Sequence, residues 1–189
     1  SEMLFEINKI KINDETLRLW LLEAKIPYEQ RRKRPHRERR ERRARLGELV
    51  QTDGSHHDWF EGRGPKCVLM GYIDDATGRP WARFEPYEGT LPAMRSLKGY
   101  IKRYGIPAAL YLDKHMTYRS PKQRTIEDEL AGRKAMSQFQ RAAEELGIKV
   151  IHADSPQAKG RIERLFRTFQ HRLIKEMRLA NICTIEAGN

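Results

Sequence analysis

Cysteine is scarce in this sequence of 189 residues. Its two cysteines, Cys67 in an apolar run and Cys183 near the end, have neither the spacing of a zinc site nor the density of a disulfide framework. Long apolar runs are also lacking, since the longest covers only about 67–72, far short of the ~20 residues that cross a bilayer. No signal peptide is visible. We therefore expect no membrane partner and a reducing, cytoplasmic setting.

Acidic residues are outnumbered, with 26 against 37 Lys and Arg, and the formal net charge is +11. The excess is concentrated in residues 31–45, where ten Arg or Lys stand against two Glu and supply +8 of the +11. Because this stretch has almost nothing apolar to bury before Leu46, we expect a linker or arm that meets an anionic partner first. The alternative is a solvated linker or a localisation-like basic run. The cations that we expect to contact DNA phosphates are Arg31, Arg32, Lys33, Arg34, Arg39 and Arg40.

Before the basic stretch, residues 13–25 have an apolar stripe at helical spacing. Asn13 is the expected N-cap of this helix, and Pro27 follows its end. The residues before Asn13 supply no convincing further element. We therefore expect a single short amphipathic helix at this end of the chain.

From Gly47 onward, short β-prone runs alternate with turns and with helical periodicity. Glycines are expected to end two of the helices, at Gly105 and Gly147. The expected strands are 49–52, 68–73, 81–87, 108–112 and 148–151, and the expected helices are 91–104, 136–146 and 162–177. This order predicts an α/β fold with a mixed five-stranded sheet flanked by helices, in which the first three strands are joined by hairpins.

Three carboxylates could meet at such a sheet. Asp53 is expected to end the first strand and Asp113 the fourth. If those strands are neighbours, the two aspartates lie side by side and need a cation to neutralise them. Glu163 lies at the border of the apolar stripe of the last helix, so its carboxylate can turn toward the sheet. Oxygen-only ligands favour Mg²⁺ or Mn²⁺, and two such ions can activate a hydroxyl and stabilise the leaving oxygen of a phosphodiester.

The segments that carry these carboxylates resemble the DDE core of bacterial insertion-sequence transposases, especially those of the ISNCY group. The resemblance covers roughly 47–181 and is carried by residues 52–56, 73–77, 111–113 and 155–164. Its most specific part is the Ser-Pro-Gln turn, the Gly and the Glu of the last of these segments. The resemblance implies an RNase H-like fold of the retroviral-integrase type, with Asp53, Asp113 and Glu163 as catalytic metal ligands. It also implies a DNA-contacting basic residue near Lys159. We expect Lys159 and Arg161, which flank the turn before Glu163, to bind DNA, and the alternative is that both are solvated charges.

The resemblance further implies cleavage at the transposon 3′ end and attack of the freed 3′-hydroxyl on target DNA. We expect residues 1–30 to be the remnant of a helix-turn-helix region, 31–46 an Arg-rich linker and 47–189 the catalytic core. The expected partners are transposon ends and target DNA, with a homo-oligomer on DNA, association with the bacterial nucleoid and no small-molecule cofactor. The alternatives are a structure-specific nuclease of the same fold and a non-catalytic DNA-binding or assembly module derived from a transposase.

Several residues near these segments have simpler interpretations. We expect Asp74 and Asp75 to form a hairpin turn. The histidines His56, His57 and His115 are interpreted as hydrogen-bond partners rather than catalytic groups. Two further expectations concern packing and charge: Trp59 and Trp81 lie in the core, and Arg167 forms an ion pair with Glu163 one turn away.

Overall fold

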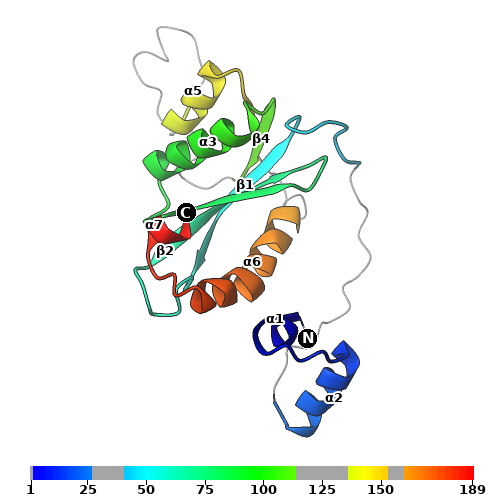
Figure 1. Cartoon of the computed structure of the whole chain (residues 1–189). Helices are drawn as coiled ribbons and strands as arrows, with labels where there is room; N and C mark the ends of the chain where they lie inside the picture. Colours follow the sequence, from blue (N-terminus) through cyan, green and yellow to red (C-terminus); the bar gives the residue numbers. More distant parts are fainter. Residues whose placement is uncertain (1, 27–40, 114–135, 153–159) are drawn as a thin grey trace, which may run out of the picture. The chain divides into compact units, whose positions relative to one another are not determined.

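The computed structural model describes residues 2–26, 41–113, 136–152 and 160–189 (Figure 1). The chain divides into two compact units, Ser1–Arg40 and Glu41–Asn189. Lys159, His115 and the basic residues named above between 31 and 40 lie outside the described residues. Those expected DNA contacts therefore stay predictions.

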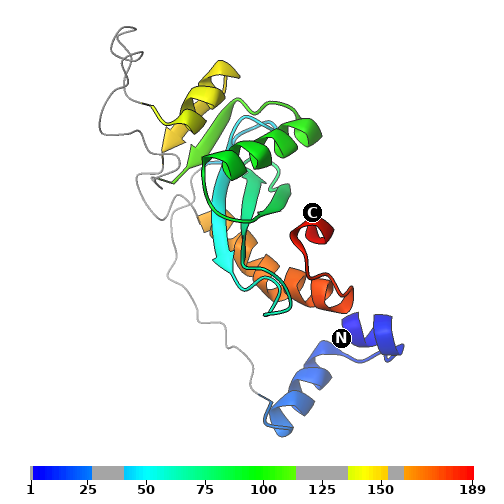
Figure 2. The ribbon, with the colours of Figure 1, turned by 90° about the vertical axis from the view of Figure 1, so that its left-hand side faces the viewer.

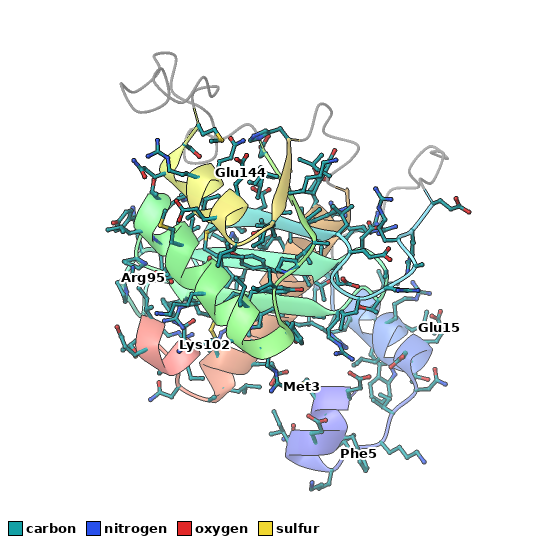
Figure 3. All side chains as sticks on the ribbon, turned by 90° about the horizontal axis from the view of Figure 1, so that it is seen from above. Met3, Phe5, Glu15, Arg95, Lys102 and Glu144 are labelled. Carbon is teal, nitrogen blue, oxygen red and sulfur yellow. The ribbon has the colours of Figure 1, made fainter. Side chains whose placement is uncertain are left out.

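The first unit contains two short helices, α1 (Glu2–Asn8) and α2 (Asp14–Glu23). The N-cap prediction for α2 is confirmed, because the Asn13 side chain accepts a hydrogen bond of 2.9 Å from the backbone N–H of Glu15. The expectation of a single helix is wrong, since α1 precedes it. Its apolar side chains Met3 and Phe5, labelled in Figure 3, are exposed, so α1 shows no buried apolar stripe. Such a stripe is the signal on which a prediction from sequence depends.

The second unit is built on a five-stranded mixed sheet in the order β3-β2-β1-β4-β5. The strands are β1 (Val50–His57), β2 (Cys67–Asp74), β3 (Pro80–Glu85), β4 (Ala109–Leu112) and β5 (Lys149–His152). The first three strands pair antiparallel as hairpins, whereas β4 is parallel to both β1 and β5. The predicted α/β fold is confirmed, including the contact between the first and fourth strands.

The first strand is longer than predicted, because β1 does not end before Asp53. It continues to His57, which pairs with Cys67, and Asp53 lies within the strand opposite Gly71. The residues from Asp53 to His57 have low β-propensity taken singly, but their pairing with an apolar β2 outweighs it. The prediction that Asp53 marks a strand end is therefore wrong.

Helices cover both faces of the sheet (Figures 1 and 2). The helices α3 (Thr90–Tyr104) and α5 (Gln138–Glu145) lie on one face, and α6 (Gly160–Leu179) and α7 (Ile185–Gly188) lie on the other. Gly105 follows α3 with a φ of 88°, which confirms the predicted helix end. Over the stretches that the structure describes, no helix has the length and apolarity needed to cross a bilayer.

Each face has its own apolar core. The core under α3 and α5 includes Val50, Tyr72, Leu110 and Leu112. The core under α6 and α7 includes Trp59, Leu69, Phe84, Ile162 and Phe166. Trp59 is buried in the second core and Trp81 packs against the first, as predicted.

The edge strand β3 is partly covered by the residue that follows α7. The side-chain amide of Asn189 accepts a hydrogen bond of 2.7 Å from the Phe84 backbone N–H and donates one of 3.0 Å to the Phe84 carbonyl. One side chain thus satisfies both backbone groups of an edge residue, as a neighbouring strand would do.

Candidate active site

The parallel pairing of β1 and β4 brings the two predicted aspartates toward one another. Val50 pairs with Leu110 and Gln51 with Tyr111. Asp53 and Asp113 each lie two residues beyond the second pair, so the same register makes them neighbours across adjacent strands. Parallel strands lie ~4.8 Å apart, a spacing at which two carboxylates can share a cation.

Alternation along the strands indicates which face the aspartates occupy. Val50, Leu110 and Leu112 belong to the core under α3 and α5. Since successive side chains point to opposite faces, Asp53 and Asp113 project toward the α6 face. Asp53 is half-buried and Asp113 is exposed. This face is the one on which α6, the helix of Glu163, is packed.

The close approach of α6 to the sheet depends on Gly71, the cross-strand partner of Asp53. A Cβ at this position would lie 2.6 Å from Cε1 of Phe166 and 3.3 Å from Cδ1 of Ile162. Both side chains belong to the first two turns of α6. The absence of a side chain at Gly71 therefore lets the start of α6 rest against the strand next to Asp53.

Glu163 lies in the first turn of α6, one residue after the buried Ile162, and its side chain is exposed. The predicted ion pair between Glu163 and Arg167 is wrong, because none joins them in the part of the chain that the structure describes. Both side chains are exposed, and water competes effectively with an ion pair at such a site.

The donor chemistry of Asp53, Asp113 and Glu163 fits a hard divalent cation, because all three supply carboxylate oxygens. The positions of the three carboxylates do not yet form a metal site. Within residues 2–26, 41–113, 136–152 and 160–189, no group of three or more candidate ligands lies close enough to hold a metal ion. The structure thus places Asp53 on β1, Asp113 directly after the neighbouring strand β4, and Glu163 on the helix over the same face, without gathering the three carboxylates.

Asp74 and Asp75 have a structural role that the sequence only partly predicted. Asp74 accepts hydrogen bonds from the backbone N–H groups of Thr77 and Gly47, each at 2.8 Å, and Asp75 accepts one of 2.9 Å from the N–H of Arg43. Both aspartates are about 1% exposed. They form the predicted turn after β2 and also fix the segment that leads into β1.

Arg161 is used within the protein. Its guanidinium forms an ion pair with the Asp75 carboxylate and also donates a hydrogen bond of 2.8 Å to the Asp75 carbonyl. The Asp75 side chain is fully buried and that of Arg161 is 19% exposed. The first turn of α6 is therefore tied to the β2–β3 turn. The spacing of the basic and acidic residues, 86 positions apart, gave no signal of this pair.

Two of the three histidines named above, His56 and His57, lie at the end of β1. His56 Nε2 lies 2.6 Å from Oε2 of Glu88. The ring of His57 contacts Trp59 edge to face, with centroids 5.4 Å apart. The interpretation of His56 as a hydrogen-bond partner is confirmed.

The fold defined by this sheet is that of retroviral integrase catalytic cores. The chain superposes on the simian T-cell lymphotropic virus intasome, solved with a PP2A regulatory subunit, with a TM-score of 0.59 and 19% identity over 82% of this chain and 51% of that one. The HTLV-2 integrase catalytic core, solved with magnesium, gives a TM-score of 0.56 and 18% identity over 77% and 82% of the two chains. The BIV integrase core gives 0.54 and 20% over 75% and 78%.

Two proteins that are related in sequence are named as transposases. A Sinorhizobium fredii protein named as a transposase, y4bF, is 43% identical over 100% of this chain. The transposase for insertion sequence IS1202 of Streptococcus pneumoniae is 36% identical over 76% of it. The chain spans 40% and 30% of the lengths of these two relatives. No family model matches. The resemblance of this chain to insertion-sequence transposases with an integrase-type core is therefore confirmed.

Proposed function

We propose that this chain contains the catalytic core of a DDE transposase, a polynucleotidyl transferase that cuts DNA at the 3′ ends of a transposon and joins them to target DNA. The observation that carries the proposal is the register of β1 and β4, which makes Asp53 and Asp113 neighbours on the face covered by α6. The transposase relatives and the integrase fold support the same reaction class.

Asp53, Asp113 and Glu163 are the residues that would hold Mg²⁺ or Mn²⁺, in one or two ions. When bound, two such ions supply the Lewis acidity that activates a nucleophilic oxygen and stabilises the leaving oxygen of a phosphodiester. The relative that was solved with magnesium is an integrase core of the same fold. The site needs the Glu163 carboxylate to approach the aspartates more closely. Because the start of α6 is held by Ile162 and by the Asp75–Arg161 pair, the exposed side chain of Glu163 is the part that would move.

Other residues of the protein position the helix that carries Glu163. Gly71 admits α6 to the sheet beside Asp53, and the Asp75–Arg161 pair fixes the start of that helix. Positioning of this kind has large effects on rate, since a misplacement of about 1 Å can cost roughly 10²-fold. The proposed partners are transposon ends and target DNA, on which the protein would act as a homo-oligomer, in the cytoplasm with the nucleoid.

The test compares Glu163→Gln with wild type in Mn²⁺-dependent nicking of DNA that carries the element's terminal repeat. We expect a loss of at least about 10²-fold, the effect of removing one group that stabilises charge in a transition state. Glu176→Gln is the matched control, because Glu176 is exposed on the same helix about 20 Å further along. Equal nicking by wild type and Glu163→Gln would end the proposal.

The nuclease and the non-catalytic module predict other outcomes. A plain nuclease cuts DNA but joins no ends, so transfer of a cut 3′ end to a target plasmid distinguishes it from a transposase. A DNA-binding module cuts nothing and binds with equal strength whether or not Glu163 is replaced.

A further inference from the structure

A pocket with several basic side chains lies between the first turns of α6 and the β2–β3 turn. It has a volume of about 280 Å³ and is formed entirely within the second unit. Its lining residues are Arg42, Ile73, Asp75, Gly78, Arg161, Arg164, Leu165 and Thr168. Three arginines and one aspartate thus line a single cavity.

The charge of this pocket is only partly neutralised by the protein. Asp75 is the one acid among the lining residues, and its two oxygens already accept from Arg161 and from the Arg43 backbone N–H. In the part of the chain that the structure describes, no carboxylate pairs with Arg42 or Arg164. Both are exposed. The pocket therefore carries a formal excess of about two positive charges.

The arrangement of these groups suits a phosphate. Arg164 extends back over the start of α6, with its Nη1 3.7 Å from the position that a Cβ of Gly160 would occupy. Arg42 comes from the segment that enters β1. Guanidinium groups from two segments can bind adjacent oxygens of one anion in a forked geometry, which phosphate matches well.

We propose that Arg42 and Arg164, which line the same pocket as the paired Arg161, form a binding site for backbone phosphates of DNA. This proposal deepens the proposed function and rests on it, because it assigns a contact for the same substrate. Arg42 belongs to the basic stretch 31–45, in which ten Arg or Lys stand against two Glu, and a long polyanion can neutralise such a run of cations together with the pocket. DNA is therefore favoured over an acidic protein.

Most of the pocket lies on another side of α6 from Glu163. At ~100° per residue, Arg161, Leu165 and Thr168 lie about 140–160° around α6 from Glu163, and Arg164 lies about 100° from it. We therefore expect the phosphates bound in the pocket to be different from the phosphate at which the DNA strand is cut.

The test measures the salt dependence of DNA binding by the whole chain. A fluorescent duplex of about 30 bp and unrelated sequence is titrated with wild type and with Arg42→Gln/Arg164→Gln. The titrations are made at about 50, 100 and 200 mM NaCl. Each lost phosphate contact lowers the salt slope by about 0.9, so we expect a decrease of about 1.8. A fourfold rise in salt then weakens binding by the variant about 12-fold less than it weakens wild type.

The matched control is Lys98→Gln/Lys102→Gln, which has the same net charge as the test variant. Both lysines are exposed on α3, on the other face of the sheet, and Lys102 is labelled in Figure 3. A slope equal to that of wild type in the test variant, or an equal decrease in the control, overturns the phosphate site. So does an equal loss of binding to poly-glutamate, since the site would then accept any polyanion.

Nicking assays separate this proposal from the proposed function. The test variant is expected to need more terminal DNA than wild type for half-maximal nicking. If wild type binds DNA but does not nick it, the proposed function is wrong, and the comparison of DNA binding still tests the phosphate site. If wild type and the test variant both nick DNA and bind it equally well, only the phosphate site is wrong.

Discussion

Replacement of Gly71 by alanine tests how tightly α6 is held against the sheet. The new Cβ would lie 2.6 and 2.8 Å from Cε1 and Cζ of Phe166 and 3.3 Å from Cδ1 of Ile162. Carbon atoms prefer ~3.5 Å or more, so the ring must retreat by roughly 1 Å. Overpacking of this kind costs about 1–3 kcal/mol, and at about 2–4 °C per kcal/mol for a chain of this size we expect the Tm to fall by roughly 2–12 °C.

The same replacement is expected to slow nicking more than the loss of stability explains. Glu163 follows Ile162 directly, so a shift of about 1 Å in this turn carries its carboxylate away from Asp53 and can cost roughly 10²-fold in rate. Thermal unfolding and nicking below the Tm are the two measurements.

Two further variants test whether the contact between residue 71 and Phe166 causes these effects. Gly160→Ala is the control, because among the residues that the structure describes its Cβ would meet nothing closer than 3.7 Å, and alanine is the better helix former. Phe166→Leu in the Gly71→Ala background should relieve the contact and show a coupling of about 0.5–3 kcal/mol in a double-mutant cycle. An unchanged Tm in Gly71→Ala, or strictly additive effects with Phe166→Leu, would refute the close-approach argument.

Three other outcomes are expected. Asp75→Asn should destabilise the core by about 3 kcal/mol in urea unfolding, because it leaves a partly buried guanidinium without its charge partner, and a change below ~1 kcal/mol would contradict this. Burial, with a smaller contribution from the Asp58 carboxylate, raises the pKa of the Cys67 thiol from 9.0 to about 11. Alkylation at pH 8 should therefore be roughly 10²-fold slower than in urea. Because the folded pKa is the higher one, this group's contribution to stability is complete below pH 9 and is lost as the pH rises through 11. Tyr72→Phe removes a buried hydrogen bond of 2.7 Å to Ser96 and should cost about 1 kcal/mol by thermal unfolding.

Much of the fold could be predicted from periodicity and capping. The apolar stripe of α6, the N-cap of α2 at Asn13 and the end of α3 at Gly105 all follow from local rules, and the structure confirms each. The length of β1 could not be predicted in this way. Its second half, from Asp53 to His57, forms a strand because β2 is available as a partner, and propensity contains no information about partners.

In the candidate site, too, local sequence patterns predicted some features, and contacts between distant segments determine the others. The sequence pointed to Asp53 and Asp113 as candidate ligands, and the register of β1 and β4, extended by two residues, makes them neighbours. The role of Gly71 could not be predicted from its apolar run. It depends on contact with α6, whose Ile162 lies 91 residues further along the chain. The ion pair of Asp75 with Arg161 is equally remote in sequence. Contacts between distant segments are the part that local patterns do not encode.

The amide of Asn189 has a consequence for how copies of this core could associate. An exposed outer strand offers its backbone as a template on which a strand from another molecule can add. At Phe84 that template is interrupted, because the donor and the acceptor are both already engaged within the same polypeptide. Extension of the sheet past β3 at this residue would first require Asn189 to be displaced, so self-association through side-chain surfaces is favoured over the growth of a shared sheet at this point.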